Sequence, residues 1–328
     1  MLLSMIVPVY NEEDVINSFY LKTASVLDSE PYDAEIIFVN DGSSDSTLDI
    51  LLHLKEADSR IVIVDLSRNF GKEIAMTAGL DYCKGDAIVV IDADLQDPPE
   101  LIPELIAKWQ QGYDVVYAKR ISRDGESAMK KLTSKAFYRV INRVIRVPIP
   151  EDTGDFRLMS RRAVTALNSL RERNRFMKGL FAWIGYPQTA VLYHRDPRYA
   201  GKSKWNYFAL LDLAVEGLTS FTIAPLKIST YIGFLTALGA FLYGIWIIFK
   251  TLIYGDPVAG YPTLMVVILF LGGVQLLALG IIGEYLGRIF SESKQRPLYL
   301  LNGLYQSSPS ERAGITATEK VIPVDPPT

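Results

Sequence analysis

The first hundred residues alternate between short apolar runs and longer amphipathic segments. The apolar runs cover residues 2–9, 35–40, 61–65 and 87–91, and segments with helical periodicity separate them. A short apolar run followed by a helical pattern, repeated along the chain, is typical of βαβ units with a parallel sheet. We therefore predict an α/β domain with one strand over each of these runs.

Polar residues follow three of these runs at the point where each run ends. They occupy residues 10–13 after the first run, 41–45 after the second and 92–97 after the fourth. Because the carboxyl ends of parallel strands face the ligand crevice of an open sheet, we expect these side chains to converge on one site. No G-x-G-x-x-G follows any of the runs, which argues against a dinucleotide-binding fold.

The polar segment after the fourth run contains a pattern that suits a divalent cation. Asp92, Asp94 and the amide of Gln96 offer hard oxygen ligands. Mg²⁺ and Mn²⁺ bind a few such groups and complete their shell with water and substrate phosphates, so a diphosphate is the expected partner. The alternative is that Asp92 and Asp94 only cap the helix that Pro98 and Pro99 begin.

Few other side chains point to a particular chemistry. Lys72 lies at the start of a predicted helix, where it contacts a phosphate or is an ordinary surface lysine. The single cysteine, Cys83, excludes an internal disulfide, and the two histidines, His53 and His194, leave no zinc-binding pattern. Redox and zinc chemistry are therefore not expected.

Two long apolar stretches follow in the second half of the chain. Residues 228–249 are 22 residues without a charge, and residues 257–283 are another 27. At about 1.5 Å per residue, either helix spans the roughly 30 Å hydrocarbon core of a bilayer. Lys227 precedes the first stretch, and Arg288, Lys294 and Arg296 follow the second. The positive-inside rule then predicts a two-helix transmembrane hairpin with both flanks in the cytoplasm.

Two further segments suggest contact with a membrane surface. Residues 119–146 hold nine basic residues against two acidic ones, and the 126–146 part is expected to form an amphipathic basic helix on anionic lipid. A soluble surface helix would show the same pattern. Residues 205–227 form a second expected interfacial segment. We thus divide the chain into a cytoplasmic catalytic domain (1–204), this segment, the hairpin (228–287) and a cytoplasmic tail (288–328), disordered after about residue 307.

Four motifs in order resemble those of glycosyltransferase family 2. They are PVYNEE at 8–13, NDGSSD at 40–45, DADLQDPP at 92–99 and TGDFRL at 153–158. Within the family the chain is most similar to the polyisoprenyl-phosphate glycosyltransferases, such as dolichol-phosphate mannose synthases and bactoprenol glucosyltransferases of the GtrB type, over residues 1–295. The resemblance implies a GT-A fold, the Rossmann-like domain of nucleotide-diphospho-sugar transferases, followed by two transmembrane helices.

The resemblance also implies roles for particular residues. It implies catalytic roles for Asp155 and Asp94 and a metal site at Asp92, Asp94 and Gln96. The substrate-binding residues that we expect are Pro8, Tyr10, Glu12, Asp41, Lys72, Asp92, Ala93, Arg120, Arg198 and Lys204. The last two belong to a stretch, 198–204, that resembles the family's basic loop over the phosphates.

The reaction expected from this resemblance is the inverting transfer of a hexose, glucose first, from a UDP-sugar to undecaprenyl or another polyprenyl phosphate at the cytoplasmic membrane face. The product would serve cell-surface glycan modification, and Mg²⁺ or Mn²⁺ would be the cofactor. A phosphate monoester is largely dianionic at neutral pH, its second pKa being about 6, so Asp155 is expected to orient a reactant more than to remove a proton. Alternatively, Asp155 pairs with Arg157 to hold its loop.

Several alternatives and partners remain open from the sequence. Mannose or an aminoarabinose derivative could replace glucose, and a non-catalytic membrane scaffold that binds nucleotide sugars is a different class of function. A processive polysaccharide synthase is disfavoured because the chain lacks a Q-x-x-R-W motif and has only two apolar stretches. The expected partners are the UDP-sugar, the lipid phosphate, the membrane, a separate flippase and a second copy of the chain, but no nucleic acid.

Overall fold

The computed structural model describes residues 1–121, 153–193, 224–254 and 260–306. The strands are β1 (Leu2–Val9), β2 (Asp33–Asn40), β3 (Ile61–Leu66), β4 (Ala87–Val90), β5 (Val115–Arg120), β6 (Thr153–Ser160), β7 (Gln188–Tyr193) and β8 (Leu301–Tyr305). The helices are α1 (Ile16–Asp28), α2 (Thr47–Ala57), α3 (Lys72–Tyr82), a 3₁₀ turn η1 (Pro99–Leu101), α4 (Ile102–Gln110), α6 (Arg161–Asn168), α7 (Met177–Trp183), α9 (Ala224–Tyr254) and α10 (Tyr261–Ser293).

Several sequence predictions fall outside these residues. The basic helix over 126–146, Arg198, Lys204 and the interfacial segment as far as residue 223 lie outside the described residues, as does the tail after residue 306. The chain divides into two units, residues 1–210 with 296–328 and residues 211–295.

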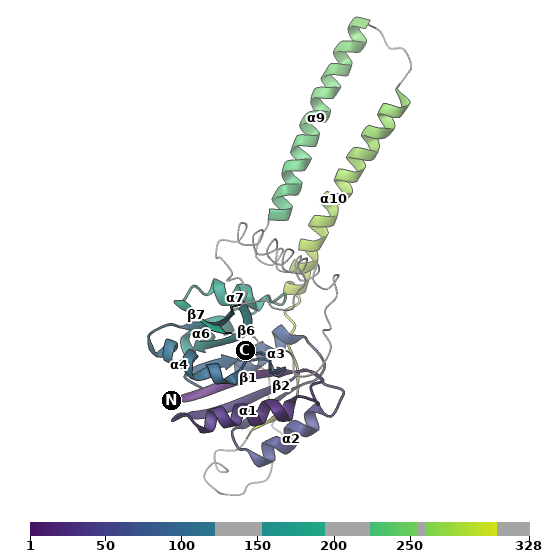
Figure 1. The fold of residues 1–328 in the computed structure, drawn as a ribbon. Helices are drawn as coiled ribbons and strands as arrows, with labels where there is room; N and C mark the ends of the chain where they lie inside the picture. Colours follow the sequence, from purple (N-terminus) through teal and green to yellow (C-terminus); the bar gives the residue numbers. More distant parts are fainter. Residues whose placement is uncertain (122–152, 194–223, 255–259, 307–328) are drawn as a thin grey trace. The chain divides into compact units, whose positions relative to one another are not determined.

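The strands of the first unit form one eight-stranded sheet in the order β7-β5-β6-β4-β1-β2-β3-β8 (Figure 1). The four predicted strands β1 to β4 are confirmed, and they are parallel to one another. β6 runs antiparallel to β4 on one side, and β8 runs antiparallel to β3 at the opposite edge. The fold is therefore a mixed α/β sheet with a parallel centre.

Helices cover both faces of the parallel centre, which is why its strands read as continuous apolar runs. On one face, α1, α2 and α4 contribute to a core with alternate residues of β1, including Leu3, Met5 and Val7. On the other face α3 packs directly on β1: a Cβ on Gly79 would lie 2.3 Å from Cγ2 of Ile6. Only glycine at this position allows so close an approach of helix and strand.

The segment after the second apolar helix contributes a strand to the sheet of the first unit. α10 continues to Ser293, beyond the predicted end of the hairpin at residue 287, and residues 301–305 then form β8 of the catalytic sheet. Leu304 is buried there, and the hydroxyl of Tyr299 donates to Asp81 Oδ2 at 2.8 Å. The apolar side chains of this short strand become buried because the strand covers the edge of β3. No local sequence pattern predicts this pairing.

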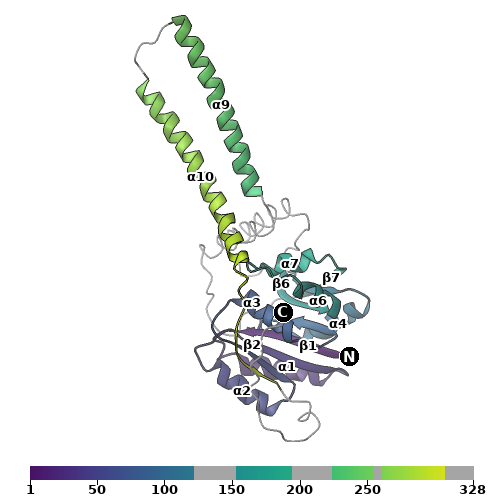
Figure 2. The ribbon, with the colours of Figure 1, turned by 180° about the vertical axis from the view of Figure 1, so that it is seen from behind.

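The second unit consists of α9 and α10, which contact each other as an antiparallel pair (Figure 2). The helices are 31 and 33 residues long, and their spans Leu226–Trp246 and Phe270–Ser293 are long and apolar enough to cross a membrane. Large apolar side chains such as Phe234, Leu235 and Leu277 are exposed on them. A helix pair that is apolar on its outer surface is unusual in water and matches a hydrocarbon environment.

Candidate active site

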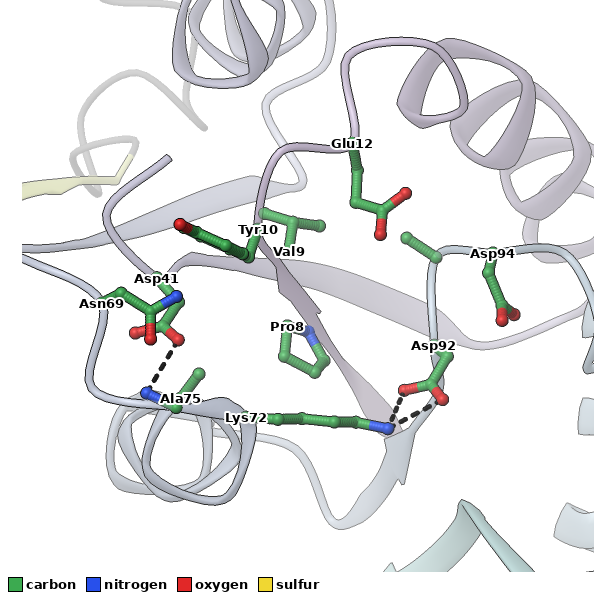
Figure 3. Close-up of a pocket in the computed structure, with 12 residues that line it drawn as sticks. Pro8, Val9, Tyr10, Glu12, Asp41, Asn69, Lys72, Ala75, Asp92 and Asp94 are labelled. Atoms are coloured by element: carbon green, nitrogen blue, oxygen red, sulfur yellow. Dashed lines mark hydrogen bonds and ion pairs between the residues drawn. The ribbon is translucent and has the colours of Figure 1, made fainter. Parts of the chain in front are cut away.

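A pocket of about 390 Å³ lies where the carboxyl ends of β1 and β4 meet (Figure 3). In the sheet, β1 lies next to both β2 and β4. The chain leaves β1 toward β2 and leaves β4 toward the opposite edge of the sheet, and open α/β sheets bind ligands where the direction changes in this way. The predicted residues that line the pocket are Pro8, Tyr10, Glu12, Asp41, Lys72, Asp92, Ala93 and Asp94. The structure thus brings together three motifs that are far apart in the sequence.

The pocket also has lining residues that the sequence analysis missed, namely Val9, Asn69, Gly71 and Ala75. Asn69 and Gly71 belong to the loop before Lys72, and their position next to a candidate phosphate contact was the available signal. Val9 and Ala75 carry no polar group, so no chemical pattern could single them out.

Hydrogen bonds join the loops after β1 and β2. The backbone N–H of Asn11 donates to Ser43 Oγ at 3.0 Å, and Asn11 Oδ1 accepts from the backbone N–H of Ser44 at 2.8 Å. The backbone N–H of Glu12 donates to Thr47 Oγ1 at 2.9 Å. These mutual bonds hold the two motif loops as one wall, so Tyr10 and Asp41 keep a fixed spacing.

Asp41 ties that wall to the loop before α3. Its carboxylate accepts the backbone N–H groups of Phe70 at 2.7 Å and Gly71 at 2.9 Å. Burial raises the pKa of Asp41, and the two backbone donors oppose that rise. The next residue, Gly42, has φ +65°, and a Cβ there would lie 2.4 Å from the carbonyl carbon of Arg68. This contact explains why glycine follows Asp41.

Asp155 reaches the pocket through the pairing of β4 and β6. In this antiparallel ladder Val90 is opposite Arg157, and continuing the register sets Asp155 opposite Asp92. Two carboxylates opposite each other repel, and Lys72 lies between them. Its Nζ is 2.6 Å from Asp92 Oδ1 and 2.5 Å from Asp155 Oδ2, and Figure 3 shows its side chain extending to Asp92.

The charged groups in this cluster shift one another's pKa values. Burial would raise the pKa of Asp155, but the positive charges of Lys72 and Lys178 outweigh it and hold that pKa well below its usual range. Desolvation would lower the pKa of Lys72, but the carboxylates of Asp155 and Asp92 raise it instead. Both groups are therefore ionised at neutral pH. Lys178 of α7 is a neighbour that the sequence analysis missed.

Glu73 is a second missed residue at this site. It follows Lys72 in α3, and its Oε2 accepts the backbone N–H of Met177, the first residue of α7, at 3.0 Å. Burial and then the negative charge of Asp155 raise the pKa of Glu73 from 4.5 to about 7. A carboxyl group that titrates near neutral pH therefore lies next to the Lys72–Asp155 ion pair.

The start of β6, which carries Asp155, is held by arginines. Arg157 donates to the backbone oxygens of Gly154 at 2.9 Å and Asp155 at 3.3 Å, and its guanidinium lies 3.7 Å from the centre of the Phe181 ring. The carboxylate of Asp155 itself pairs with Lys72, and the positive charge of Arg157 also lowers its pKa.

Arg120 lies beside the same start of β6. Its Nε donates to the hydroxyl of Tyr193 at 3.3 Å, and that hydroxyl donates in turn to the buried Asp97. A Cβ on Gly154 would lie 3.1 Å from Arg120 Nη2. Arg120 therefore lies next to Gly154 at the start of β6, and its contact with a substrate stays a prediction.

Asp92 and Asp94 alone offer too few ligands for a divalent cation, so a bound substrate would have to supply the others. Within the described part of the chain, no three His, Cys, Asp or Glu side chains gather to hold a metal. Asp92 and Asp94 both line the pocket, and Asp94 Oδ1 accepts the backbone N–H of Gln96 at 3.1 Å. Mg²⁺ is commonly held by one or two carboxylates together with substrate phosphates and water, so this donor set fits such an ion.

Comparisons with known proteins agree with this geometry. Residues 4–167 match the family model "Glycosyl transferase family 2", and residues 224–289 match "GtrB C-terminal hairpin". A bactoprenol glucosyl transferase of Shigella phage SfV is 50 % identical over 92 % of this chain and 98 % of its own length. A prophage bactoprenol glucosyl transferase homolog of Escherichia coli K12 is 48 % identical over the same shares.

A more distant likeness is found among solved structures. Glucosyl-3-phosphoglycerate synthase of Mycobacterium tuberculosis, solved with Mn²⁺, UDP-glucose and phosphoglyceric acid, is 20 % identical, with a TM-score of 0.45 over 67 % of this chain and 78 % of that chain. So distant a likeness says nothing about ligands of this chain. The two family models and the close relatives together show that the chain is an enzyme of glycosyltransferase family 2 with a C-terminal hairpin of the GtrB type.

Proposed function

We propose that this enzyme transfers a hexose, glucose first, from a UDP-sugar to undecaprenyl or another polyprenyl phosphate, with inversion at the anomeric carbon. The observation that carries the proposal is the cluster beside the pocket in which Lys72 Nζ lies 2.6 Å from Asp92 Oδ1 and 2.5 Å from Asp155 Oδ2. Relatives named bactoprenol glucosyl transferase support the glucosyl group and the lipid acceptor.

The pocket offers separate groups for each part of a nucleotide sugar. Tyr10, 38 % exposed, presents an aromatic face to a base, and the carboxylate of Asp41 retains lone pairs for a base or ribose donor. At the other end Lys72 brings a positive charge that favours a diphosphate. Mg²⁺ or Mn²⁺ bound through Asp92 and Asp94, with Gln96 as a further predicted ligand, would neutralise the leaving diphosphate.

Asp155 acts in this proposal by position. The lipid phosphate is already largely dianionic near pH 7, its second pKa being about 6, so it needs no strong base to attack. The carboxylate of Asp155 is ionised and held by Lys72, and it can orient the acceptor or the sugar for in-line displacement. Placement within about 1 Å matters because such a shift can cost roughly 100-fold in rate.

We place the catalytic domain at the cytoplasmic face of the cell membrane, with α9 and α10 crossing it. The basic residues flanking the hairpin, Lys227 before it and Lys294 and Arg296 after it, favour this orientation. A lipid product made on this side needs a separate flippase to serve glycan modification at the cell surface. A homo-oligomer stays a further prediction.

The test is a transfer assay with the full chain in lipid nanodiscs. We expect UDP release from UDP-glucose that depends on added polyprenyl phosphate, with less from UDP-aminoarabinose and no GDP release from GDP-mannose. EDTA should abolish turnover, and Mg²⁺ or Mn²⁺ should restore it. Nucleotide-sugar binding without turnover would instead indicate a scaffold, and full activity of Asp94→Ala in metal-depleted buffer would contradict the metal site.

A further inference from the structure

β8, the strand that follows the membrane hairpin, carries an exposed side chain whose amide reaches a buried carboxylate of β3. Its pairing with β3 is regular from Ile63 to Asp65, but Asp65 is opposite Gly303 while Leu66 is opposite Leu301. Asn302 is therefore the extra residue of a β-bulge. Bulges redirect a side chain, and here the Asn302 amide reaches Asp65 Oδ2 at 2.6 Å.

Asp65 is also hydrogen-bonded to the next strand, β2. It is 2 % exposed in β3, and while Oδ2 accepts from Asn302, Oδ1 accepts from Asn40 Nδ2 at 2.7 Å. A buried carboxylate needs donors on both oxygens, and these two amides supply them. Asp65 thus links β8 with the carboxyl end of β2.

The contact also determines which way the Asn40 amide points. A carboxylate accepts only the NH₂ end of an amide, so the Asn40 oxygen must face away from Asp65. That oxygen accepts the backbone N–H of Ser43 at 3.2 Å. Ser43 belongs to the loop that carries Asp41, one of the residues lining the pocket.

We propose that Asn302 is a positioning residue for donor binding, which acts through Asp65 and Asn40 on the 41–44 loop without touching the donor. The same loop anchors the neighbouring walls, because Ser43 Oγ accepts from Asn11 and Asp41 accepts from Phe70 and Gly71. The strand that returns from the membrane hairpin therefore supports the nucleotide end of the pocket. Only the kinetic consequence rests on the proposed UDP-sugar donor.

The test compares Asn302→Ala with a matched change in the same segment. Tyr299→Phe removes a hydrogen bond of 2.8 Å to Asp81, a residue of α3 that does not line the pocket. In the full chain, we expect Asn302→Ala to speed amide hydrogen exchange at residues 41–44 and to raise the KM for UDP-glucose roughly three- to tenfold, with kcat within about twofold. Tyr299→Phe should change neither, and Asn302→Gln, which keeps the amide donor, should restore part of the loss.

Three results would overturn the inference. One is unchanged hydrogen exchange at residues 41–44 in Asn302→Ala. The others are an equal effect of Tyr299→Phe and a loss of kcat together with melting temperature in Asn302→Ala, either of which would mean that β8 only stabilises the fold. Hydrogen exchange needs no substrate, so it tests the inference even if UDP-glucose is not the donor.

Discussion

At the scale of single residues, Lys72 has more than one role at the site. Sequence position suggested a phosphate contact or a surface lysine, whereas the structure shows it between two carboxylates from different strands. Without a cation, facing carboxylates raise each other's pKa and share a proton. Lys72 offsets the repulsion between Asp92 and Asp155, and its positive charge lowers the pKa of Asp155.

Replacing Lys72 by methionine tests this role. We expect kcat/KM for sugar transfer to fall about 100-fold or more, because the reacting groups lose both position and charge. Since Lys72 helps to hold the pKa of Asp155 down, the activity that remains should fall more steeply toward low pH than that of the wild type. The pH profile of initial rates measures both effects.

Lys22→Met is the matched control for Lys72→Met. Lys22 also forms an ion pair, 3.1 Å from Glu100, but on the surface of α1, where such pairs contribute about 0–1 kcal/mol. Its removal should leave rate and pH profile unchanged. A Lys72→Met enzyme with the activity and pH profile of the wild type would show that the two carboxylates need no cation.

At the scale of elements, the first turn of α3 organises the site. Gly71 and Lys72 line the pocket, while Glu73 holds α7 through the backbone N–H of Met177. α7 in turn carries Lys178, whose charge acts on Asp155, and Phe181, which packs on Arg157. The start of one helix thereby connects residues that line the pocket with the groups around Asp155.

Glu73→Gln should make stability less dependent on pH. The pKa of Glu73 is raised in the folded state to about 7, so between its unfolded value and pH 7 the folded protein binds a proton that unfolding releases. The free energy of unfolding of the wild type should fall as pH rises through this window. Above pH 7 Glu73 is ionised in both states, so the loss does not increase further. Glutamine keeps an acceptor for Met177 without the charge.

The measurement is the apparent melting temperature of the full chain at pH 5.5 and pH 8. At pH 8 the variant should melt at a higher temperature than the wild type, by about 2–4 °C for each kcal/mol of ionisation cost that the substitution removes. At pH 5.5 this difference in melting temperature should disappear. Glu104→Gln, on the exposed side of α4, serves as control. Parallel curves for Glu73→Gln and wild type would mean that Glu73 is ionised throughout this range.

At the scale of the whole molecule, one chain combines a sheet whose apolar side chains are buried with a helix pair whose apolar side chains are exposed. Leu235 and Leu277 are exposed on α9 and α10, whereas the side chains of β1 to β4 are almost entirely covered. An uncovered apolar surface of this kind is stable in lipid, where the helices satisfy their own backbone hydrogen bonds.

We expect the protein to stay in membranes washed with alkaline carbonate. Leu235→Arg combined with Leu277→Arg should abolish this retention, because each arginine near the centre of a span costs about 2.5–3.5 kcal/mol on insertion. Leu21→Arg, at an exposed position of α1 in the catalytic unit, should have no effect. Release of the wild type by carbonate would contradict a membrane-spanning hairpin.

The sequence by itself determined the parts of this protein that local patterns encode. Strands β1 to β4 follow from short apolar runs, and α9 and α10 follow from long ones. The polar motifs after β1, β2 and β4 were placed together correctly because parallel strands must end at the same edge of a sheet. Glycosyltransferase motifs at these ends were enough to identify the family.

Only the tertiary structure decided how the motifs act on one another. Lys72 meets Asp155 across 83 positions of sequence because β6 pairs antiparallel with β4, and a strand's register depends on packing over its whole length. Asn302 reaches Asp65 across 237 positions through a bulge in a strand that follows the hairpin. Ion pairs and edge strands of this kind have no local periodicity, so they exist only once the sheet has brought distant segments together.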